Sequence, residues 1–170
     1  MITNPYRILG IDTSLRSSGI GVIEVNSSKI SAIAYGRIHN KSTEPHSICL
    51  KQIYNSIRDI INEHMPNYVA IEGAFFSKNA KTAMILGQAR GAAITACSQS
   101  NLPITEHSPR KVKQAVTGSG SAQKDQVAKM VMQLLGLSEQ PQEDAADALG
   151  IAICHYHQLS LPEPLRSPLI

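Results

Sequence analysis

The beginning of the chain contains three apolar segments of the kind that forms β-strands. Ile8, Leu9 and Ile11 predict a strand buried on both faces, and this strand ends at Asp12. A turn is expected at residues 17–19, where Ser-Ser-Gly precedes a second apolar run, and residues 29–38 alternate imperfectly as a third strand. Since only short turns separate these three strands, we expect them to pair antiparallel.

The remainder of the chain combines helical spacing with two short strands. Isoleucines recur at helical spacing between residues 46 and 64, which predicts an amphipathic helix that ends before Pro66. Ser108 and Pro109 are typical of a helix start, and Gly136 is typical of a helix end. Further helices are predicted over residues 79–98, 109–116, 122–135 and 143–157, and strands over residues 68–72 and 102–106.

This order of elements predicts an α/β domain with a mixed sheet. We expect a single domain over residues 1–158, followed by a tail over residues 159–170 whose prolines favour an extended or mobile segment. The helix over residues 79–98 is rich in alanine and glycine, so another helix or a second subunit can approach it closely. Tight internal packing explains the same pattern at least as well.

The composition is that of an ordinary globular protein, because 42% of the 170 residues are hydrophobic and 17% are charged. The formal net charge of +3 permits a polyanionic partner without requiring one. Cys49, Cys97 and Cys154 are far apart and no secretory signal is visible, so we expect reduced cysteines and a cytoplasmic location. The longest apolar stretches are well below about 18 residues, so we expect no membrane span.

Four acidic residues stand at positions where burial makes carboxylates costly. Asp12 and Glu72 each end a predicted strand, while Asp144 and Asp147 project from one face of the last helix. If the first and fourth strands are neighbours and the last helix packs across them, the four acids converge. Unit charges about 4 Å apart repel by about 4 kcal/mol at an effective dielectric constant of about 20, so such a cluster favours bound cations. An exposed hairpin position for Asp12 and the favourable helix N-terminus for Asp144 are the simpler alternatives.

Clustered carboxylates favour the metal-dependent hydrolysis of phosphodiester bonds. Their hard oxygen atoms bind Mg²⁺ or Mn²⁺, and a pair of such ions can activate water and stabilise a leaving oxygen. Other site types are disfavoured. The segment Gly118-Ser119-Gly120 lacks the Gly-Lys-Ser/Thr ending of a nucleotide-binding loop, and neither zinc-ligand spacing nor a Ser/His nucleophile arrangement occurs.

Several short segments form a collinear pattern along the chain. They are Leu9-Gly10-Ile11-Asp12, Ile71-Glu72 followed by Phe75-Phe76-Ser77-Lys78-Asn79-Ala80, Leu86-Gly87-Gln88-Ala89-Arg90-Gly91, Val112-Lys113-Gln114-Ala115-Val116-Thr117-Gly118 and Asp144-Ala145-Ala146-Asp147-Ala148-Leu149. Together they resemble the RuvC family of Holliday junction resolvases, over residues 7–157. Each segment alone would be a weak signal, whereas their combination is highly specific.

The resemblance implies an RNase H-like fold, in which a five-stranded mixed sheet, with three antiparallel strands followed by two parallel ones, is flanked by helices. It implies a homodimer that resolves four-way DNA junctions by paired symmetric nicks in recombination and DNA repair, beside a RuvAB-type branch-migration complex. By family position Asp12, Glu72, Asp144 and Asp147 are the catalytic residues and the ligands of two Mg²⁺ ions, for which Mn²⁺ can substitute.

The same resemblance implies DNA contacts. Phe75 matches an aromatic residue that stacks on a base near the junction centre, although core packing is the commoner role of phenylalanine and is expected for Phe76. Lys113 and Lys124 match lysines near the active site, whereas the sequence alone would make each a solvated helix charge. Weaker candidates for phosphate contacts are Lys78, Arg90 and Arg110, together with Arg16, Lys81 and Lys111.

Two departures from the family pattern concern the neighbours of the acids. Thr13-Ser14 stands where the family usually has Pro-Gly, and Gly73 stands where it usually has Gln. These departures leave open a junction-binding protein without cleavage activity. A further alternative is an ATPase or sugar kinase of the actin-like group, which is disfavoured because 170 residues leave no room for its second domain.

Overall fold

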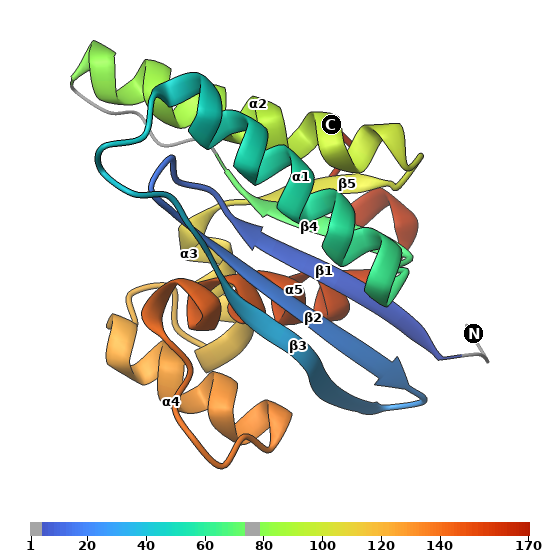
Figure 1. Cartoon of the computed structure of the whole chain (residues 1–170). Helices are drawn as coiled ribbons and strands as arrows, with labels where there is room; N and C mark the ends of the chain where they lie inside the picture. The colour runs from blue at the N-terminus through green and yellow to red at the C-terminus, as the bar shows by residue number, and fades with distance from the viewer. Residues whose placement is uncertain (1–4, 74–78) are drawn as a thin grey trace.

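The computed structural model describes residues 5–73 and 79–170, which form a five-stranded sheet with helices on both faces (Figure 1). The strands are β1 (Tyr6–Asp12), β2 (Ser17–Asn26), β3 (Lys29–His39), β4 (Tyr68–Glu72) and β5 (Ile104–His107). They lie in the order β3-β2-β1-β4-β5. β2 pairs antiparallel with β1 and β3, whereas β4 runs parallel to β1 and β5. The predicted mixed sheet is therefore confirmed.

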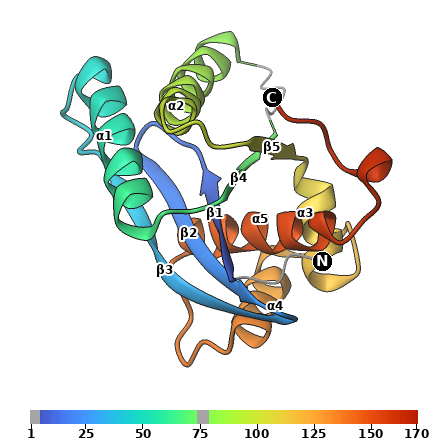
Figure 2. The same ribbon diagram turned by 90° about the vertical axis from the view of Figure 1, so that its right-hand side faces the viewer.

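Helices pack on both faces of the sheet (Figure 2). They are α1 (His46–His64), α2 (Ala80–Gln99), α3 (Pro109–Thr117), α4 (Lys124–Leu135), α5 (Glu143–Leu159) and the short 3₁₀ helix η1 (Glu163–Leu165). Leu9 and Ile11 belong to the core beneath α1 and α2, and Ile8 belongs to the core beneath α3, α4 and α5. All three side chains are fully buried, which confirms the strand predicted to be buried on both faces. No helix in the described part of the chain has the length and apolar character needed to cross a lipid bilayer.

α5 lies close to the sheet because β1 and β2 have glycines beneath it. A Cβ atom at Gly10 would lie 2.0 Å from the carbonyl oxygen of Ala148, and one at Gly19 would lie 1.8 Å from that of Asp144. Both obstacles are backbone atoms, so a side chain at either position would displace the helix. Gly19 also pairs with Asp12 across the sheet. The glycines therefore let α5 hold its first turns directly against the end of β1.

The turn between β1 and β2 differs from the prediction. Residues 17–19, expected to form the turn, belong to β2 and pair with β3. The chain turns at residues 13–16 instead, where the Ser18 hydroxyl donates to the Ser14 carbonyl oxygen (2.6 Å) and accepts from the Ser14 backbone N–H (3.1 Å). Serine and glycine are typical of turns, but pairing with β3, and for Gly19 also with β1, outweighs that local preference here.

The other predicted boundaries differ from the observed ones by at most two residues. α4 begins at Lys124, two residues later than predicted, because the Gln123 backbone N–H donates to the Gln126 side chain (2.8 Å) and defines the helix start. The Ser108 side chain accepts a hydrogen bond from the Lys111 backbone N–H, which confirms Ser108 as the cap of α3.

The tail after α5 returns to the free edge of β5. Leu169 forms an isolated antiparallel bridge with Thr105, and the Ile170 backbone N–H donates to the Ile104 carbonyl oxygen (3.0 Å). η1 interrupts the otherwise extended course of this segment. The domain boundary at residue 158 and the mobility of the tail stay predictions.

The three cysteines, Cys49, Cys97 and Cys154, are buried free thiols. Burial raises the pKa of Cys97 to about 12 and that of Cys154 to about 11. Since the thiolate is the reactive form, Cys97 and Cys154 serve as small apolar residues of the core.

Candidate active site

A cavity of about 280 Å³ lies where the ends of β1 and β4 meet α3, α4 and α5. Its charged residues are Asp12 of β1, Glu72 of β4, Lys113 of α3, Lys124 of α4 and Asp147 of α5. The structure thus brings three of the predicted acids together with both predicted lysines. The rest of the lining is apolar and consists of Pro109, Val112, Val127 and Ile151.

Strand register and helix placement explain how these side chains meet. β1 and β4 are parallel neighbours with Ile11 beside Ile71, so the residues that follow, Asp12 and Glu72, end at the same edge of the sheet. α5 crosses β1 and β2 on one face of the sheet, and its second turn contains Asp147. The sequence predicted that the acids converge if the first and fourth strands are neighbours and the last helix packs across them. The structure shows both arrangements.

Asp144 lies at the border of this cavity rather than in its lining. The Ser17 hydroxyl donates a hydrogen bond to the Asp144 carboxylate, so β2 as well as α5 positions this acid. Repulsion from Asp144 still contributes to the raised pKa values of Asp12 and Asp147. Asp144 is also in the first turn of α5, where the positive end of the helix dipole favours an acidic residue.

Burial and mutual repulsion make the acids difficult to ionise. Burial, followed by the charges of Asp147 and Asp144, raises the pKa of Asp12 from 3.8 to about 6. Burial, followed by the charge of Asp12, raises the pKa of Glu72 from 4.5 to about 7. Burial also raises the pKa of Asp147. The protein alone therefore leaves the negative charge of this cavity incompletely compensated.

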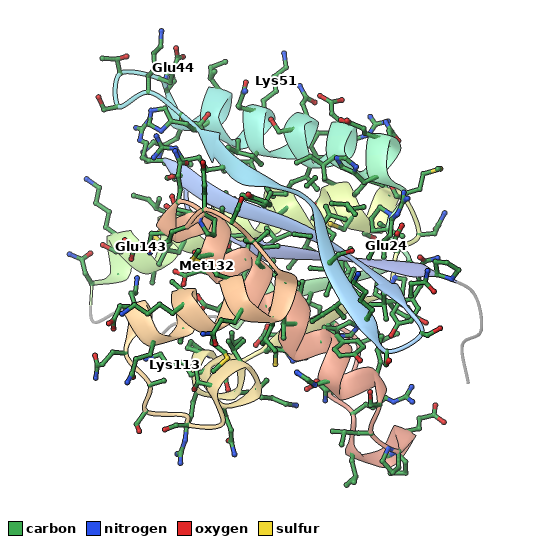
Figure 3. The ribbon with its side chains drawn as sticks, turned by 90° about the horizontal axis from the view of Figure 1, so that it is seen from below. Glu24, Glu44, Lys51, Lys113, Met132 and Glu143 are labelled. Atoms are coloured by element: carbon green, nitrogen blue, oxygen red, sulfur yellow. The ribbon has the colours of Figure 1, made fainter. Side chains whose placement is uncertain are left out.

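Lys124 provides part of the compensating charge. Its ammonium nitrogen lies 2.5 Å from a carboxylate oxygen of Glu143 and 3.8 Å from one of Asp147. The hydrogen bond to Glu143 is the main cause of the raised pKa of Lys124. Lys113 is the second lysine of the cavity, and its charge partly offsets the rise in the pKa of Asp147. Figure 3 labels Glu143 and Lys113. Because Lys124 and Glu143 are both largely exposed, their pair adds little stability, and Lys124 can turn toward an anionic substrate.

The other predicted DNA contacts lie outside this cavity. Arg90 forms an ion pair with Glu106 and borders a separate cavity of about 150 Å³. Arg110 is exposed on α3 and does not line either cavity. Phe75 and Lys78 lie outside the described residues, as does Phe76. Their predicted roles stay predictions.

Arg16 and Lys111, two of the weaker candidates for phosphate contacts, form hydrogen bonds within the protein. The Arg16 guanidinium donates to the carbonyl oxygens of Lys41 (2.5 Å) and Glu44 (3.0 Å), which holds the loop before α1. The Lys111 ammonium donates to the Ser167 hydroxyl of the tail (2.9 Å). These contacts favour structural roles for both residues.

Sequence reasoning missed several residues of the site. Ser17 was assigned to a turn, and nothing local to it indicates that its hydroxyl reaches Asp144 on the distant α5. Glu143 directly precedes Asp144, so the acidic start of that helix was a visible signal for a lysine partner. The apolar lining formed by Val112 and Ile151 follows only from the packing of α3 on α5.

The donor set of the cavity fits a hard divalent cation. Carboxylate oxygens are the ligands that Mg²⁺ and Mn²⁺ prefer, and burial followed by the charges of neighbouring acids raises the pKa values of Asp12 and Glu72, an environment that a bound cation would offset. Within residues 5–73 and 79–170, no three His, Cys, Asp or Glu side chains already form a metal-binding group. The acids would therefore have to adjust on binding a cation.

Comparison with known proteins gives a consistent result. The family model described as crossover junction endodeoxyribonuclease RuvC matches residues 8–155. The proteins of that name from Caldicellulosiruptor saccharolyticus and Shewanella woodyi are 49% and 48% identical to this chain over 151 residues, which cover 88% of this chain and 91% and 86% of the two relatives. The family is thus matched over most of the chain.

Solved structures show the same relationship. The T. thermophilus RuvC in complex with Holliday junction substrate has a TM-score of 0.87 and 30% identity, covering 97% of this chain and 99% of that chain. The yeast mitochondrial Holliday junction resolvase, at 15% identity, covers 88% of this chain and 77% of its own with a TM-score of 0.62, which shows the fold alone. The predicted RNase H-like fold is confirmed. By sequence and by structure, this chain belongs to the RuvC family of crossover junction endodeoxyribonucleases.

Proposed function

We propose that this chain resolves four-way DNA junctions by hydrolysing two opposing strands symmetrically, in DNA recombination and repair. The observation that best supports this function is the meeting of Asp12, Glu72 and Asp147 in one cavity with Lys113 and Lys124. Acids and lysines together suit a phosphodiester substrate that must be held and hydrolysed. The T. thermophilus relative, whose structure contains a Holliday junction substrate, supports the choice of a four-way junction.

The four acids Asp12, Glu72, Asp144 and Asp147 would hold two Mg²⁺ ions, with Mn²⁺ as a substitute. Such ions, when bound, supply water activation and stabilise the charge on the leaving oxygen. The ions would offset the mutual repulsion that, after burial, raises the pKa values of Asp12 and Glu72. The Ser17 hydroxyl orients Asp144 for this role.

The lysines and the apolar lining have separate tasks. Lys124 and Lys113 would attract the scissile phosphate and hold it beside the acids, since both line the same cavity. Val112, Val127 and Ile151 would exclude bulk water from one side of the phosphate, which strengthens these charge interactions. The remaining proposed DNA contacts are Phe75 by stacking and Lys78, Arg90 and Arg110 by phosphate binding.

We also propose that the active form is a homodimer in the cytoplasm that works beside a RuvAB-type branch-migration complex. A dimer supplies one active site for each of the two opposing strands, which matches paired nicks.

The Asp147→Asn variant separates catalysis from binding. It removes one carboxylate charge from the cavity and keeps the shape of the side chain. We expect cleavage of a synthetic four-way junction to fall by about 100-fold or more, while junction binding in a gel-shift assay is unchanged. The exposed Asp59 of α1 offers the matched control, and Asp59→Asn should leave both measurements unchanged. Equal loss of binding and of folding in Asp147→Asn would give the acid a structural role instead.

A further inference from the structure

The first residues of α4 and α5 form an ion pair beside the candidate active site. Lys124 begins α4 and Glu143 begins α5, and the Lys124 ammonium nitrogen lies 2.5 Å from a carboxylate oxygen of Glu143. Lys124 lines the cavity that contains Asp12 and Asp147, whereas Glu143 does not. Glu143 therefore holds, from outside the cavity, a lysine that belongs to it.

Lys124 is closer to Glu143 than to the acids of the cavity. Its ammonium nitrogen lies 3.8 Å from a carboxylate oxygen of Asp147, which is longer than a hydrogen bond. Lys113, by contrast, forms no ion pair with any residue in the described ranges 5–73 and 79–170. Glu143 thus compensates the charge of one cavity lysine and leaves that of the other available to a substrate.

This pair can exchange partners without disturbing the fold. Both side chains are 69% exposed, and ion pairs this exposed contribute little to the free energy of unfolding. Because Lys124 is the first residue of α4, the positive end of the helix dipole favours an anion beside its ammonium group. Carboxylate and phosphate oxygens both accept charge-assisted hydrogen bonds from ammonium groups. A phosphate oxygen can therefore take the position that the Glu143 carboxylate occupies.

We propose that Glu143 is an internal competitor of the DNA backbone: it neutralises Lys124 in the free protein, and a phosphate that enters the cavity displaces it from Lys124. This inference rests on the proposed function, because it requires DNA at this cavity. Glu143 is a positioning residue that acts through Lys124 and lowers the affinity for DNA. Its removal is thus expected to strengthen DNA binding, although Glu143 directly precedes Asp144, one of the four acids.

The salt dependence of DNA binding reports this competition. A lysine that neutralises one phosphate releases counterions from DNA and contributes about −0.9 to the slope of log K against log salt concentration. In the wild type Glu143 keeps a negative charge beside Lys124, so the pair has no net charge and contributes little to the slope. Glu143→Gln leaves the lysine charge uncompensated and should make the slope steeper by about 0.9.

Fluorescence anisotropy of a labelled four-way junction, titrated with the full chain in the presence of a metal chelator, measures this slope. We expect Glu143→Gln to bind more tightly than the wild type, with a gain at about 50 mM salt that exceeds the gain at about 200 mM by about threefold. Thermal unfolding should show the variant to be about as stable as the wild type, because the lost pair is exposed. Equal slopes for the two proteins would overturn the inference.

Asp125→Asn is the matched control. Asp125 forms an exposed pair with Lys129 at 3.9 Å, and Lys129 does not line the cavity. Because Asp125 directly follows Lys124 in sequence, this variant also removes one negative charge near that lysine. We expect it to keep the slope of the wild type. The same steepening in Asp125→Asn and Glu143→Gln would attribute the effect to net charge and contradict the proposed competition.

A double variant tests whether Glu143 acts through Lys124. In the Lys124→Gln background the lysine charge is absent, so adding Glu143→Gln should leave the slope unchanged. A steeper slope there would show that Glu143 acts by another route and would overturn the inference. A wild type that does not bind the junction would overturn both this inference and the proposed function. Junction binding with equal slopes would reject the inference alone, since none of these measurements uses DNA cleavage.

Discussion

Asp12 and Glu72 hold protons more tightly in the folded chain than in the unfolded one. The pKa of Asp12 rises from 3.8 to about 6 because of burial and the charges of Asp147 and Asp144, and that of Glu72 rises from 4.5 to about 7. Raised pKa values in the folded state mean that these groups favour folding at low pH. Their contribution is lost as the pH rises through about 6 for Asp12 and about 7 for Glu72.

The Asp12→Asn variant tests this electrostatic cost. At about pH 8 and without divalent cations, we expect it to be more stable than the wild type by about 1 to 3 kcal/mol, since it removes a half-buried charge. At about pH 4, where Asp12 of the wild type is protonated in the folded state, the two proteins should unfold at nearly the same denaturant concentration. Urea denaturation at both pH values measures the difference.

Comparison with the wild type at each pH is necessary because two histidines act in the opposite direction. Burial lowers the pKa of His107 to about 3 and that of His155 to about 4, so their contribution to stability increases with pH up to about 6.5. The wild type and Asp12→Asn both retain these histidines, so the difference between their free energies of unfolding cancels the effect of the histidines. Asp59→Asn is the control, and an equal gain there at about pH 8 would contradict the account.

The geometry of the turn that follows Asp12 could not be predicted from the local sequence. The chain has Thr13-Ser14 where the family usually has Pro-Gly, and the sequence alone left the geometry of that turn open. In the structure the reciprocal hydrogen bonds between Ser14 and Ser18 close the turn. Because Ser18 lies in β2, this closure depends on strand pairing that the local sequence did not predict.

The position of α5 depends on glycine contacts with the strands below it. A Cβ atom at Gly10 would lie 2.0 Å from the carbonyl oxygen of Ala148, so Gly10→Ala must push α5 away from β1. We expect a loss of about 3 kcal/mol or more in urea denaturation, because backbone atoms cannot rotate out of the way. Displacement of Asp144 and Asp147 should also reduce cleavage of a four-way junction.

Gly36→Ala in β3 is the matched control for this prediction. A Cβ atom at Gly36 would have no atom within 4 Å, so stability should be unchanged or should increase by up to about 1 kcal/mol. If Gly10→Ala is as stable as the control, α5 does not rest on β1 as described.

At the scale of elements, most of the structure follows from local patterns. The period of apolar residues indicated β1 to β5 and α1 to α5 but not η1, and apart from the start of β2 the observed ends differ from the predictions by at most two residues. The close approach of α5 was not predictable, because glycines such as Gly10 gain their role only when a helix packs on them. The surroundings of Gly73 also depend on tertiary packing. A Cβ atom there would lie 3.0 Å from the carboxylate of Glu106 in β5, which pairs with Arg90.

The surface of α2 bears on the assembly of the whole molecule. Ala89, Ala93 and Ala96 are fully buried, so internal packing explains part of the small-residue pattern. A Cβ atom at Gly87 or Gly91 would meet nothing within 4 Å, which leaves part of the helix open to a second subunit. Internal packing therefore accounts for the buried face of α2, and contact of its open face with a second subunit stays a prediction.

Light scattering tests the homodimer and this surface together. We expect the wild type to be a dimer at micromolar concentration and Met84→Glu to be a monomer, because Met84 of α2 is 66% exposed and a buried charge there would oppose association. Met65→Glu, at the equally exposed end of α1 (69%), should remain a dimer. A monomeric wild type would contradict the proposed assembly, and a dimeric Met84→Glu would place the interface elsewhere.

The acids show how far the sequence predicts the whole site. Asp12 and Glu72 were placed at the ends of strands, and only the sheet order makes those strands neighbours. The predicted packing of the last helix across the sheet is what brings Asp147 into the cavity with Asp12 and places Asp144 at its border. The DNA contacts at Phe75 and Lys78 lie outside the described residues and stay predictions.

Cleavage of a mobile synthetic four-way junction tests the central proposal most directly. With Mg²⁺ present, the purified chain should produce symmetric nicks in two opposing strands, with 5′-phosphate and 3′-hydroxyl ends that ligase can seal. Nicks should be absent when the metal is chelated and strongly reduced in Asp147→Asn, whereas Asp59→Asn should cut like the wild type. Junction binding without paired nicks in the presence of Mg²⁺ would contradict the account.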